Sequence, residues 1–482
     1  MSSIDGLISG MKTTDMISQL MQVEALPQAA LKNKAAVQGK SVAAFQSINT
    51  RMSSLLAAAK ALGSADTWGT MRATASSDAV VATAKPGASA GSMTFTVDKL
   101  AAAHTVTFDG WVGSLTDATT SAVMPAGTLS VRKADGGTTT VTPTDASLQS
   151  VVNAINATGG AAYKAAAVQV APGRYTLQLT SVATGAAGVF ASAPAEINQL
   201  GAADVTTQGS DARITVGSTV DAYPVTSASN TFAEVLPGVT LTVTRKQTDT
   251  PVTVSLVPDS DAVATRVQAL VDNANVALSE IAAQTRTKNG DVAAGSLVGD
   301  STARTLGQDI ISAVSSGAGD ALGSLSAVGI ALDRTGTVTF NRQKFLDSLA
   351  ADPAKTRAYF DSYTDVAHER ASATSFDPGW DKANGLARRL EAITRIASEG
   401  VVLPTDPVDK AKEGVLTGLI NRRNAAITGL NEQVASWDVR LDLRKTALER
   451  QWSALEVSLS KLQSQSSWLS GQLAGLPSSS PA

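Results

Sequence analysis

Few residues in this chain have the type and spacing that chemistry at a site would need. His104 and His368 are its only histidines, and neither has a second His or a carboxylate at metal-ligand spacing. Asp259 and Asp261 lie close together, but the further acidic ligands and closing Glu of a calcium loop do not follow, so helix capping explains them better. The glycine run "SGAGDALGSL" (316–325) departs from the dinucleotide fingerprint. We therefore predict no catalytic residues, no metal, no cofactor and no enzyme activity.

The composition excludes several other classes of protein. The net charge is −3 and no Lys/Arg cluster stands out, which argues against a nucleic-acid partner. The chain has no Cys, which excludes disulfides, thiolate catalysis and zinc–thiolate sites. No basic region followed by an apolar run opens the chain, and no stretch of about 18 apolar residues occurs, so neither a cleaved secretory signal nor a membrane span is predicted. At 482 residues, two to four domains are expected.

Long helices are predicted at both ends of the sequence. Apolar residues recur every three or four positions from Leu26-Pro27 to Gly63, and Pro fits the first turn of such a helix. A shorter helix with Thr14 or Asp15 as its cap is expected before it. A last helical block is predicted from near Gly414 to Leu473.

The middle of the chain has a sequence pattern typical of strands. Between about 67 and 258, short alternating runs rich in Val and Thr predict strands, and Asp135-Gly136-Gly137 predicts a hairpin turn. One helix is expected at 147–156, and helix returns after 258 with Asp261 as its predicted N-cap.

This order predicts an α+β multidomain fold, in which the long N- and C-terminal helices pair as a coiled-coil stem and β-rich domains are inserted between them. The expected domains are an N-terminal helical arm (1–66), a discontinuous β-rich domain (67–108 and 205–258), an inserted β-rich domain (109–204), a helix-rich stem domain (259–413) and a C-terminal coiled-coil arm (414–482).

The most informative feature is an apolar stripe on the terminal helices, without a proline or a sustained charge block. The stripe is nearly heptad, although Arg444 and Lys445 interrupt it and the step from Leu448 to Trp452 reads as a drift. An internal helical hairpin and contacts with a partner both explain such a stripe, and we favour the partner. The predicted oligomer and filament interface is Ile17, Leu20, Met21, Val434, Trp437, Leu441, Leu448, Trp452, Leu455, Leu459, Leu462, Leu469 and Leu473.

Several segments resemble one bacterial family, the flagellar filament cap protein or hook-associated protein 2. "GLISGMKTTDMISQLMQVEALP" (6–27) is similar to its N-terminal signature, with Met11 and Lys12 as departures. "SNTFAEVLPGVTLTV" (229–243) and "DPAKTRAYF" (352–360) are similar to later blocks. Residues 147–185 look like the "IN" motif of flagellar axial proteins, with matches at Asn153, Ile155, Asn156, Leu177, Leu179, Ser181 and Gly185.

The resemblance implies a structural cap at the distal tip of the filament, which promotes flagellin polymerisation, prevents subunit leakage and is required for elongation. It implies self-association into a ring, contacts with flagellin and other axial subunits, and a cytoplasmic export chaperone on the C-terminal region. It also implies an extracellular location reached by the flagellar type III route. The alternatives are another axial protein (a junction protein or flagellin), a surface adhesin whose stalk and β-rich head bind host surface glycans, and a cytosolic scaffold.

Overall fold

The fold is that of a computed structural model. The structure describes residues 12–108, 117–190, 194–197, 200–217, 221–318, 322–363, 384–400 and 413–474. The chain forms two compact units: a helical unit, from Met1–Ser64 and Ala264–Ala482, and a β unit, from Ala65–Val263. His368 and Gly319, considered above, lie outside the described residues.

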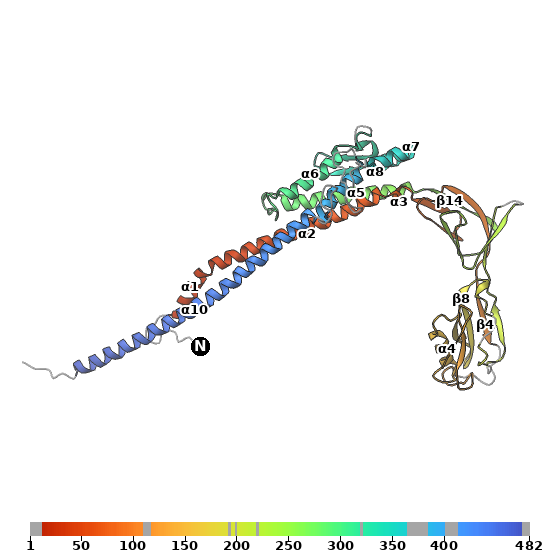
Figure 1. The fold of residues 1–482 in the computed structure, drawn as a ribbon, viewed down its shortest axis with the longest axis horizontal. Helices are drawn as coiled ribbons and strands as arrows, with labels where there is room; N and C mark the ends of the chain where they lie inside the picture. Colours follow the sequence, from red (N-terminus) through yellow and green to blue (C-terminus); the bar gives the residue numbers. More distant parts are fainter. Residues whose placement is uncertain are drawn as a thin grey trace, which may run out of the picture. The chain divides into compact units, whose positions relative to one another are not determined.

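The helical unit is built around two long helices that come from opposite ends of the chain (Figure 1). Helix α2 buries one face, which includes Phe45, Ile48, Met52 and Leu55, against α9 and α10. Pro27 occupies its first turn, as predicted. The elements are α1 (Thr13–Glu24), α2 (Leu26–Gly63), α5 (Ser260–Thr285), α6 (Ser301–Ser315), η3 (Leu325–Val328), β15 (Ile330–Leu332), β16 (Val338–Phe340), α7 (Arg342–Ala351), α8 (Pro353–Asp361), α9 (Leu386–Ser398) and α10 (Val415–Ala474).

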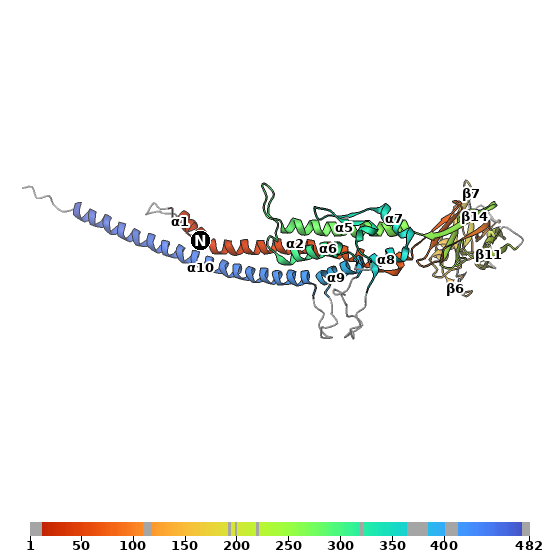
Figure 2. The same cartoon turned by 90° about the horizontal axis from the view of Figure 1, so that it is seen from above.

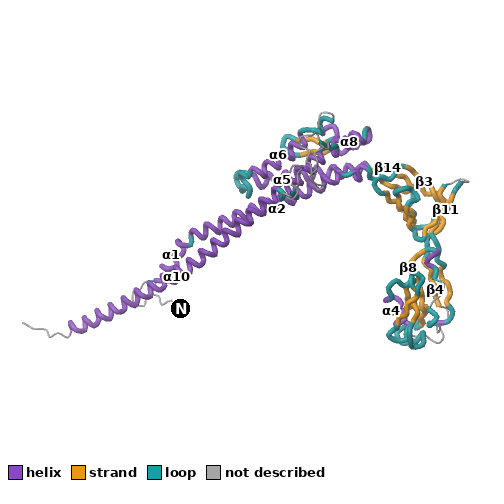
Figure 3. The backbone as a smooth tube through the Cα atoms, in the orientation of Figure 1, coloured by secondary structure: helices purple, strands orange, loops and turns teal. Residues whose placement is uncertain are grey.

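The β unit contains nearly all of the strands (Figure 3). Its elements are α3 (Ala65–Trp68), β1 (Met71–Ala75), β2 (Val80–Ala84), β3 (Gly91–Lys99), β4 (Ala103–Phe108), β5 (Leu129–Arg132), β6 (Thr138–Val141), α4 (Leu148–Ala157), β7 (Tyr163–Ala171), β8 (Arg174–Thr184), η1 (Ala186–Gly188), β9 (Ala203–Thr207), β10 (Ala212–Val216), β11 (Tyr223–Ser227), β12 (Thr231–Ala233), β13 (Val239–Val243) and β14 (Gln247–Pro258).

Two antiparallel sheets of the β unit share one core. The larger has the order β1-β14-β3-β10-β11 and the smaller β12-β13-β2. Alternate residues of their strands point inward, so that Phe95, Ile214, Leu241 and Val254 are fully buried together. This pairing joins strands from both ends of the β unit, because β1–β3 precede the inserted segment and β10–β14 follow it.

The inserted segment has a core of its own. A four-stranded sheet with the order β7-β8-β4-β9 packs with α4 and the β5–β6 hairpin. Ser147 caps α4 by accepting the backbone N–H of Ser150, and Ile155, Leu177 and Leu179 are fully buried. The side chain of Asn156 donates to the carbonyl of Ala165 (2.8 Å) and accepts from its N–H (2.9 Å), which ties α4 to β7.

The predicted fold class is confirmed, since long terminal helices flank a β-rich middle. The domain boundaries stay a prediction. The strands β4 and β9 pair with each other and β4 also pairs with β8, so we propose that the inserted domain extends a few residues beyond 109 and 204. Two caps were predicted wrongly. The N-cap of α1 is Lys12, so Thr14 and Asp15 lie inside the helix. At the start of α5, Asp259 and not Asp261 accepts the N–H of Ala262.

Candidate functional site

The site that the sequence singled out is the terminal arm, which consists of α1, the first half of α2, and α10. Helices α2 and α10 lie side by side and antiparallel (Figure 2). Gln28 donates to the carbonyl of Val434 (3.3 Å) and to the carboxylate of Asp438, whereas ten residues later Gln38 accepts from Arg423 (2.9 Å). Residue numbers therefore rise along one helix as they fall along the other.

The inner end of the arm is fixed by Arg423. Its guanidinium lies over the ring of Phe45, 5.1 Å from the centroid, and its Nη2 is 3.6 Å from a carboxylate oxygen of Asp300. Because Phe45 is fully buried on α2 and Asp300 caps α6, one side chain of α10 connects three helices.

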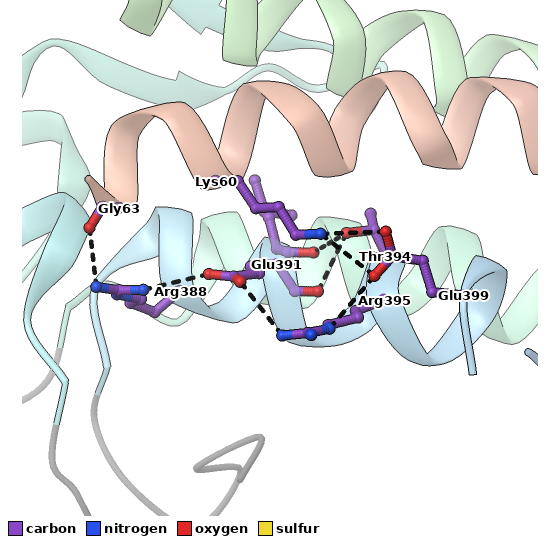
Figure 4. Close-up of polar contacts among 8 residues, drawn as sticks. Lys60, Gly63, Arg388, Glu391, Thr394, Arg395 and Glu399 are labelled. Carbon is purple, nitrogen blue, oxygen red and sulfur yellow. Dashed lines mark hydrogen bonds and ion pairs between the residues drawn. The ribbon is translucent and has the colours of Figure 1, made fainter. Parts of the chain in front are cut away.

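A chain of ion pairs holds α9 against the last turns of α2 (Figure 4). Arg388 donates to the carbonyl of Gly63 (2.8 Å) and pairs with Glu391 (3.3 Å). The other oxygen of Glu391 lies 3.8 Å from Arg395, which pairs with Glu399 (3.3 Å). Glu399 in turn pairs with Lys60 of α2 (3.1 Å). We call these residues the α9 network. It joins α9 to α2 at two points, the carbonyl of Gly63 and the side chain of Lys60.

The apolar stripe of α10 is a strict seven-residue repeat. The expected drift at Trp452 is wrong, because a step of four residues from Leu448 is the ordinary step from position d to position a of a heptad. Lys445 and Trp452 both occupy a positions. Apolar residues occupy eight successive d positions: Ile420, Ile427, Val434, Leu441, Leu448, Leu455, Leu462 and Leu469.

Only the first part of this repeat is covered. Leu448 is 8% exposed, whereas Leu455 is 42% and Leu462 61% exposed. Figure 1 shows the reason, since α10 continues past α1 without a described neighbour. The apolar d positions continue on both sides of this point, whereas the covering helix ends there.

An apolar groove lies where the cover ends. It has a volume of about 770 Å³ and is open along α1 and α10. One ion pair, from Glu24 to Arg444 (2.9 Å), closes the α1–α10 contact on its inner side. The groove is lined by Met16, Ile17, Gln19, Leu20, Val23, Glu24, Leu448, Gln451, Trp452 and Leu455.

Nothing in the described ranges suggests bond-making chemistry. They contain no group of three or more His, Cys, Asp or Glu side chains placed to hold a metal. His104 lies in β4 as a buried strand residue, where its Nδ1 accepts the N–H of Gly209 (3.3 Å) and its ring meets Phe190 edge-on. Within the same ranges, no helix is long and apolar enough to cross a membrane.

Comparison with protein families gives the identity of the chain. Residues 209–464, more than half of the sequence, match the model of the flagellar hook-associated protein 2 C-terminus, and residues 9–104 match the model of its N-terminus. The chain belongs to the flagellar hook-associated protein 2 family. It is therefore a structural flagellar cap protein and not an enzyme, as predicted.

Individual relatives agree with this family. Over 350 residues the chain is 26% identical to flagellar hook-associated protein 2 of Salmonella typhimurium, which covers 69% of this chain and 68% of the relative. It is 31% identical to lateral flagellar hook-associated protein 2 of Vibrio parahaemolyticus over 152 residues, which are 31% of this chain and 34% of that relative. The crystal structure of the D1-D2-D3 domains of the Escherichia coli flagellar cap protein FliD shares the fold, with a TM-score of 0.56 at 21% identity over 79% of this chain and 99% of that one.

The structure sorts the predicted interface residues into three groups. The groove brings together Ile17, Leu20, Leu448, Trp452 and Leu455. A second group is half-buried: Met21, Val434, Trp437, Leu441 and Leu459. A third group is exposed: Leu462, Leu469 and Leu473.

Sequence reasoning missed some residues of the arm. Met16 and Val23 line the groove and lie four before and three after Leu20, so helical spacing was the signal that could have found them. Gln28, which fixes the register of α2 against α10, carried no signal of its own because its partners are about four hundred residues away.

Proposed function

We propose that this protein caps the distal tip of the flagellar filament as a ring-shaped homo-oligomer, where it promotes flagellin polymerisation and prevents the loss of subunits. The observation that carries the proposal is the exposed part of the heptad seam, at Leu455, Leu462, Leu469 and Leu473, with the half-buried Leu459 between them. Exposed leucines on one narrow face are stabilised when another helix covers them. Helices of flagellin and of other axial subunits are the partners that the filament offers.

The same surface explains the other partners that we propose. Before assembly the seam would be a site of non-specific association, so a cytoplasmic export chaperone that holds the C-terminal region would protect it. We further propose export through the flagellar type III route to the extracellular filament tip without a cleaved signal. In the assembled cap, axial subunits would replace the chaperone on the seam.

The test is a triple substitution in the seam, Leu455→Ser, Leu459→Ser and Leu462→Ser. Burial of each leucine is worth roughly 1.5–3 kcal/mol when a partner covers it fully, so three losses suffice to abolish docking. Cells carrying the variant should release monomeric flagellin into the medium and form short filaments or none. Flagellin in the culture supernatant and filament length in electron micrographs are the two measurements.

A matched control removes three apolar residues from other faces of α10. Val439, Leu443 and Val457 are 62%, 66% and 53% exposed and lie outside the a and d positions. Their replacement by Ser should leave filaments of normal length. Export and folding of both variants are checked by recovery from the medium and circular dichroism. Normal filaments from cells with an exported, folded seam variant would refute the proposal.

A further inference from the structure

The β unit has two separate cores, and two stretches of chain run between them. One core belongs to the sheets of β1–β3 and β10–β14, which we call the two-sheet domain, and the other belongs to the inserted segment. Residues 100–102 lead from β3 into β4, and residues 208–211 lead from β9 into β10. Ala102 and Ser210 exchange backbone hydrogen bonds of 2.9 and 3.2 Å, and we call this pair of stretches the link. Two paired strands on their own bend and twist, so the link alone does not fix one domain on the other.

A third contact between the domains comes from the end of β8, which belongs to the inserted segment. Thr184 donates through Oγ1 to the carbonyl of Ala228 (2.7 Å), in the turn between β11 and β12. The N–H of Ala186 donates to the carboxylate of Asp211 (2.7 Å), just before β10, and a charged acceptor makes this the stronger type of hydrogen bond. The end of β8 therefore holds the two-sheet domain at points outside the Ala102–Ser210 pair, which opposes bending of the link.

Gly185 allows the backbone to come this close. Its φ is +92°, and a β-carbon at this position would lie 2.7 Å from both the carbonyl oxygen of Ala228 and Oδ1 of Asp211. Any other residue would push the end of β8 away from the two-sheet domain. The N–H of Gly185 also donates to the carbonyl of Ala102 (3.2 Å), so the same residue holds the link. Gly185 is one of the matches to the "IN" motif, and the cap proposal does not account for it.

His104 fills the space on the inner side of this contact. Its Nδ1 accepts the N–H of Gly209 (3.3 Å), and its own backbone N–H donates to Oγ of Ser181 (2.8 Å). Both His104 and Ser181 are buried. A β-carbon at Gly209 would lie 3.0 Å from the carbonyl oxygen of Gly185, so the link and the end of β8 are packed directly against each other.

We propose that these contacts form a rigid joint, which holds the inserted segment in one orientation on the two-sheet domain, with Asp211 as its positioning residue. The β unit then moves as one body, so that a contact made by either domain also positions the other. Without the third contact, the inserted segment would turn about the Ala102–Ser210 pair. The inference concerns a single chain and does not depend on the proposed function.

The distance between two spin labels, measured by electron paramagnetic resonance, tests the joint in the full-length protein. The chain has no Cys, so Val81→Cys on the two-sheet domain and Ala166→Cys on the inserted segment carry the labels. Both are exposed strand residues outside the joint, and dilution with unlabelled chain restricts the measurement to distances within one chain. One narrow distance distribution is expected. In Asp211→Ala its width should increase about twofold or more, because bending of the link is no longer opposed. Asp211→Asn keeps an Oδ1 acceptor and should stay narrow.

A matched pair of glycine substitutions separates the close approach from backbone strain. Gly185→Ala adds a β-carbon for which the joint has no space. Gly173→Ala adds one in the turn between β7 and β8, where φ is +65° and no other atom lies within 4 Å. Both alanines are strained by a positive φ, but only Gly185→Ala should widen the distribution. If Gly185→Ala does not fold, Thr184→Val removes one hydrogen bond of the same contact and keeps the shape of the side chain.

Circular dichroism and urea titration of each variant check that both domains are folded, as expected because no residue of either core is changed. A broad distribution in the unsubstituted protein would overturn the inference, since the two domains would then turn freely. Unchanged widths in folded Asp211→Ala and Gly185→Ala would overturn it as well. Equal widening in Gly173→Ala would show that strain elsewhere in the inserted segment has the same effect, and would refute the assignment to the joint.

Discussion

Glu391→Ala is expected to destabilise α9 more than any single change at the rim of the α9 network, because Glu391 pairs within the helix with both Arg388, which contacts α2, and Arg395. The carboxylate is largely buried, and its two oxygens lie 3.3 Å from Arg388 and 3.8 Å from Arg395. Removing it leaves two guanidinium groups on one helix face without the anion between them. Breaking a fully buried pair costs about 3–5 kcal/mol. Since both arginine side chains are about one-third exposed, solvent reduces this, and we expect roughly 1.5–3 kcal/mol.

Hydrogen exchange followed by mass spectrometry measures the loss of stability at α9 itself. For a chain of two units this is more informative than a single melting temperature. Peptides from α9 should exchange roughly ten to a hundred times faster in Glu391→Ala, since about 1.4 kcal/mol corresponds to a factor of ten. Glu391→Gln keeps the volume and separates charge from packing. Lys60→Gln removes only the exposed pair with Glu399 and should cost between 0 and about 1 kcal/mol. If Glu391→Ala and Lys60→Gln change the exchange rate of the α9 peptides by the same factor, the buried Glu391 is not the main stabilising residue of the network.

Two further predictions concern other parts of the fold. Leu177→Ala should lower the free energy of unfolding of the inserted segment by about 2–5 kcal/mol, because the side chain is fully buried, whereas Val182→Ala, on an exposed face of β8, should cost under about 0.5 kcal/mol. Equal effects in urea titrations of the two variants would mean that the faces of β8 are assigned wrongly. Hydrogen bonds from Thr335 and Thr337 to the Asp333 carboxylate lower its pKa, so the stability they add to the β15–β16 turn is present above the ordinary pKa of about 3.9 and is lost as the pH falls through the lowered value. A carboxyl NMR titration of Asp333 with a midpoint at or above 3.9 would contradict this.

Periodicity predicted most elements of the fold, because each depends on local spacing. The strand at 239–243 alternates buried and half-buried residues as its sequence does, and α4 buries Leu148, Val151 and Ile155 on one face. The capping error at α5 is of the same local kind, since two aspartates two residues apart compete for one position. The buried state of His104 was not predictable, because it depends on Phe190 and Gly209 from other parts of the β unit.

The limits of sequence reasoning are clearest in the arm. The seven-residue repeat of apolar d positions in α10 is fully present in the sequence, but it is harder to recognise because the a positions before Trp452 are polar: Asn424, Asn431, Asp438 and Lys445. Where its cover ends could not be predicted, since that depends on the offset between two helices from opposite ends of the chain. Gln28 and Val434 set this offset from 406 positions apart. The α9 network could not be predicted for the same reason, because Lys60 and Glu399 are 339 positions apart.

The charge content of α10 changes where its cover ends, and this bears on what the uncovered part is for. The helix has 60 residues, which is about 90 Å at 1.5 Å for each residue. Up to Lys461 its outer faces carry frequent charged side chains, as expected for a helix that faces water on one side. From Leu462 to Ala474 no side chain is charged, while the d-position leucines continue and become exposed. A helix that remained in water would gain from charge at the place where its apolar residues lose their cover. Depletion of charge together with exposed leucines is the composition of the centre of an interface, which supports the proposal that a partner covers this segment.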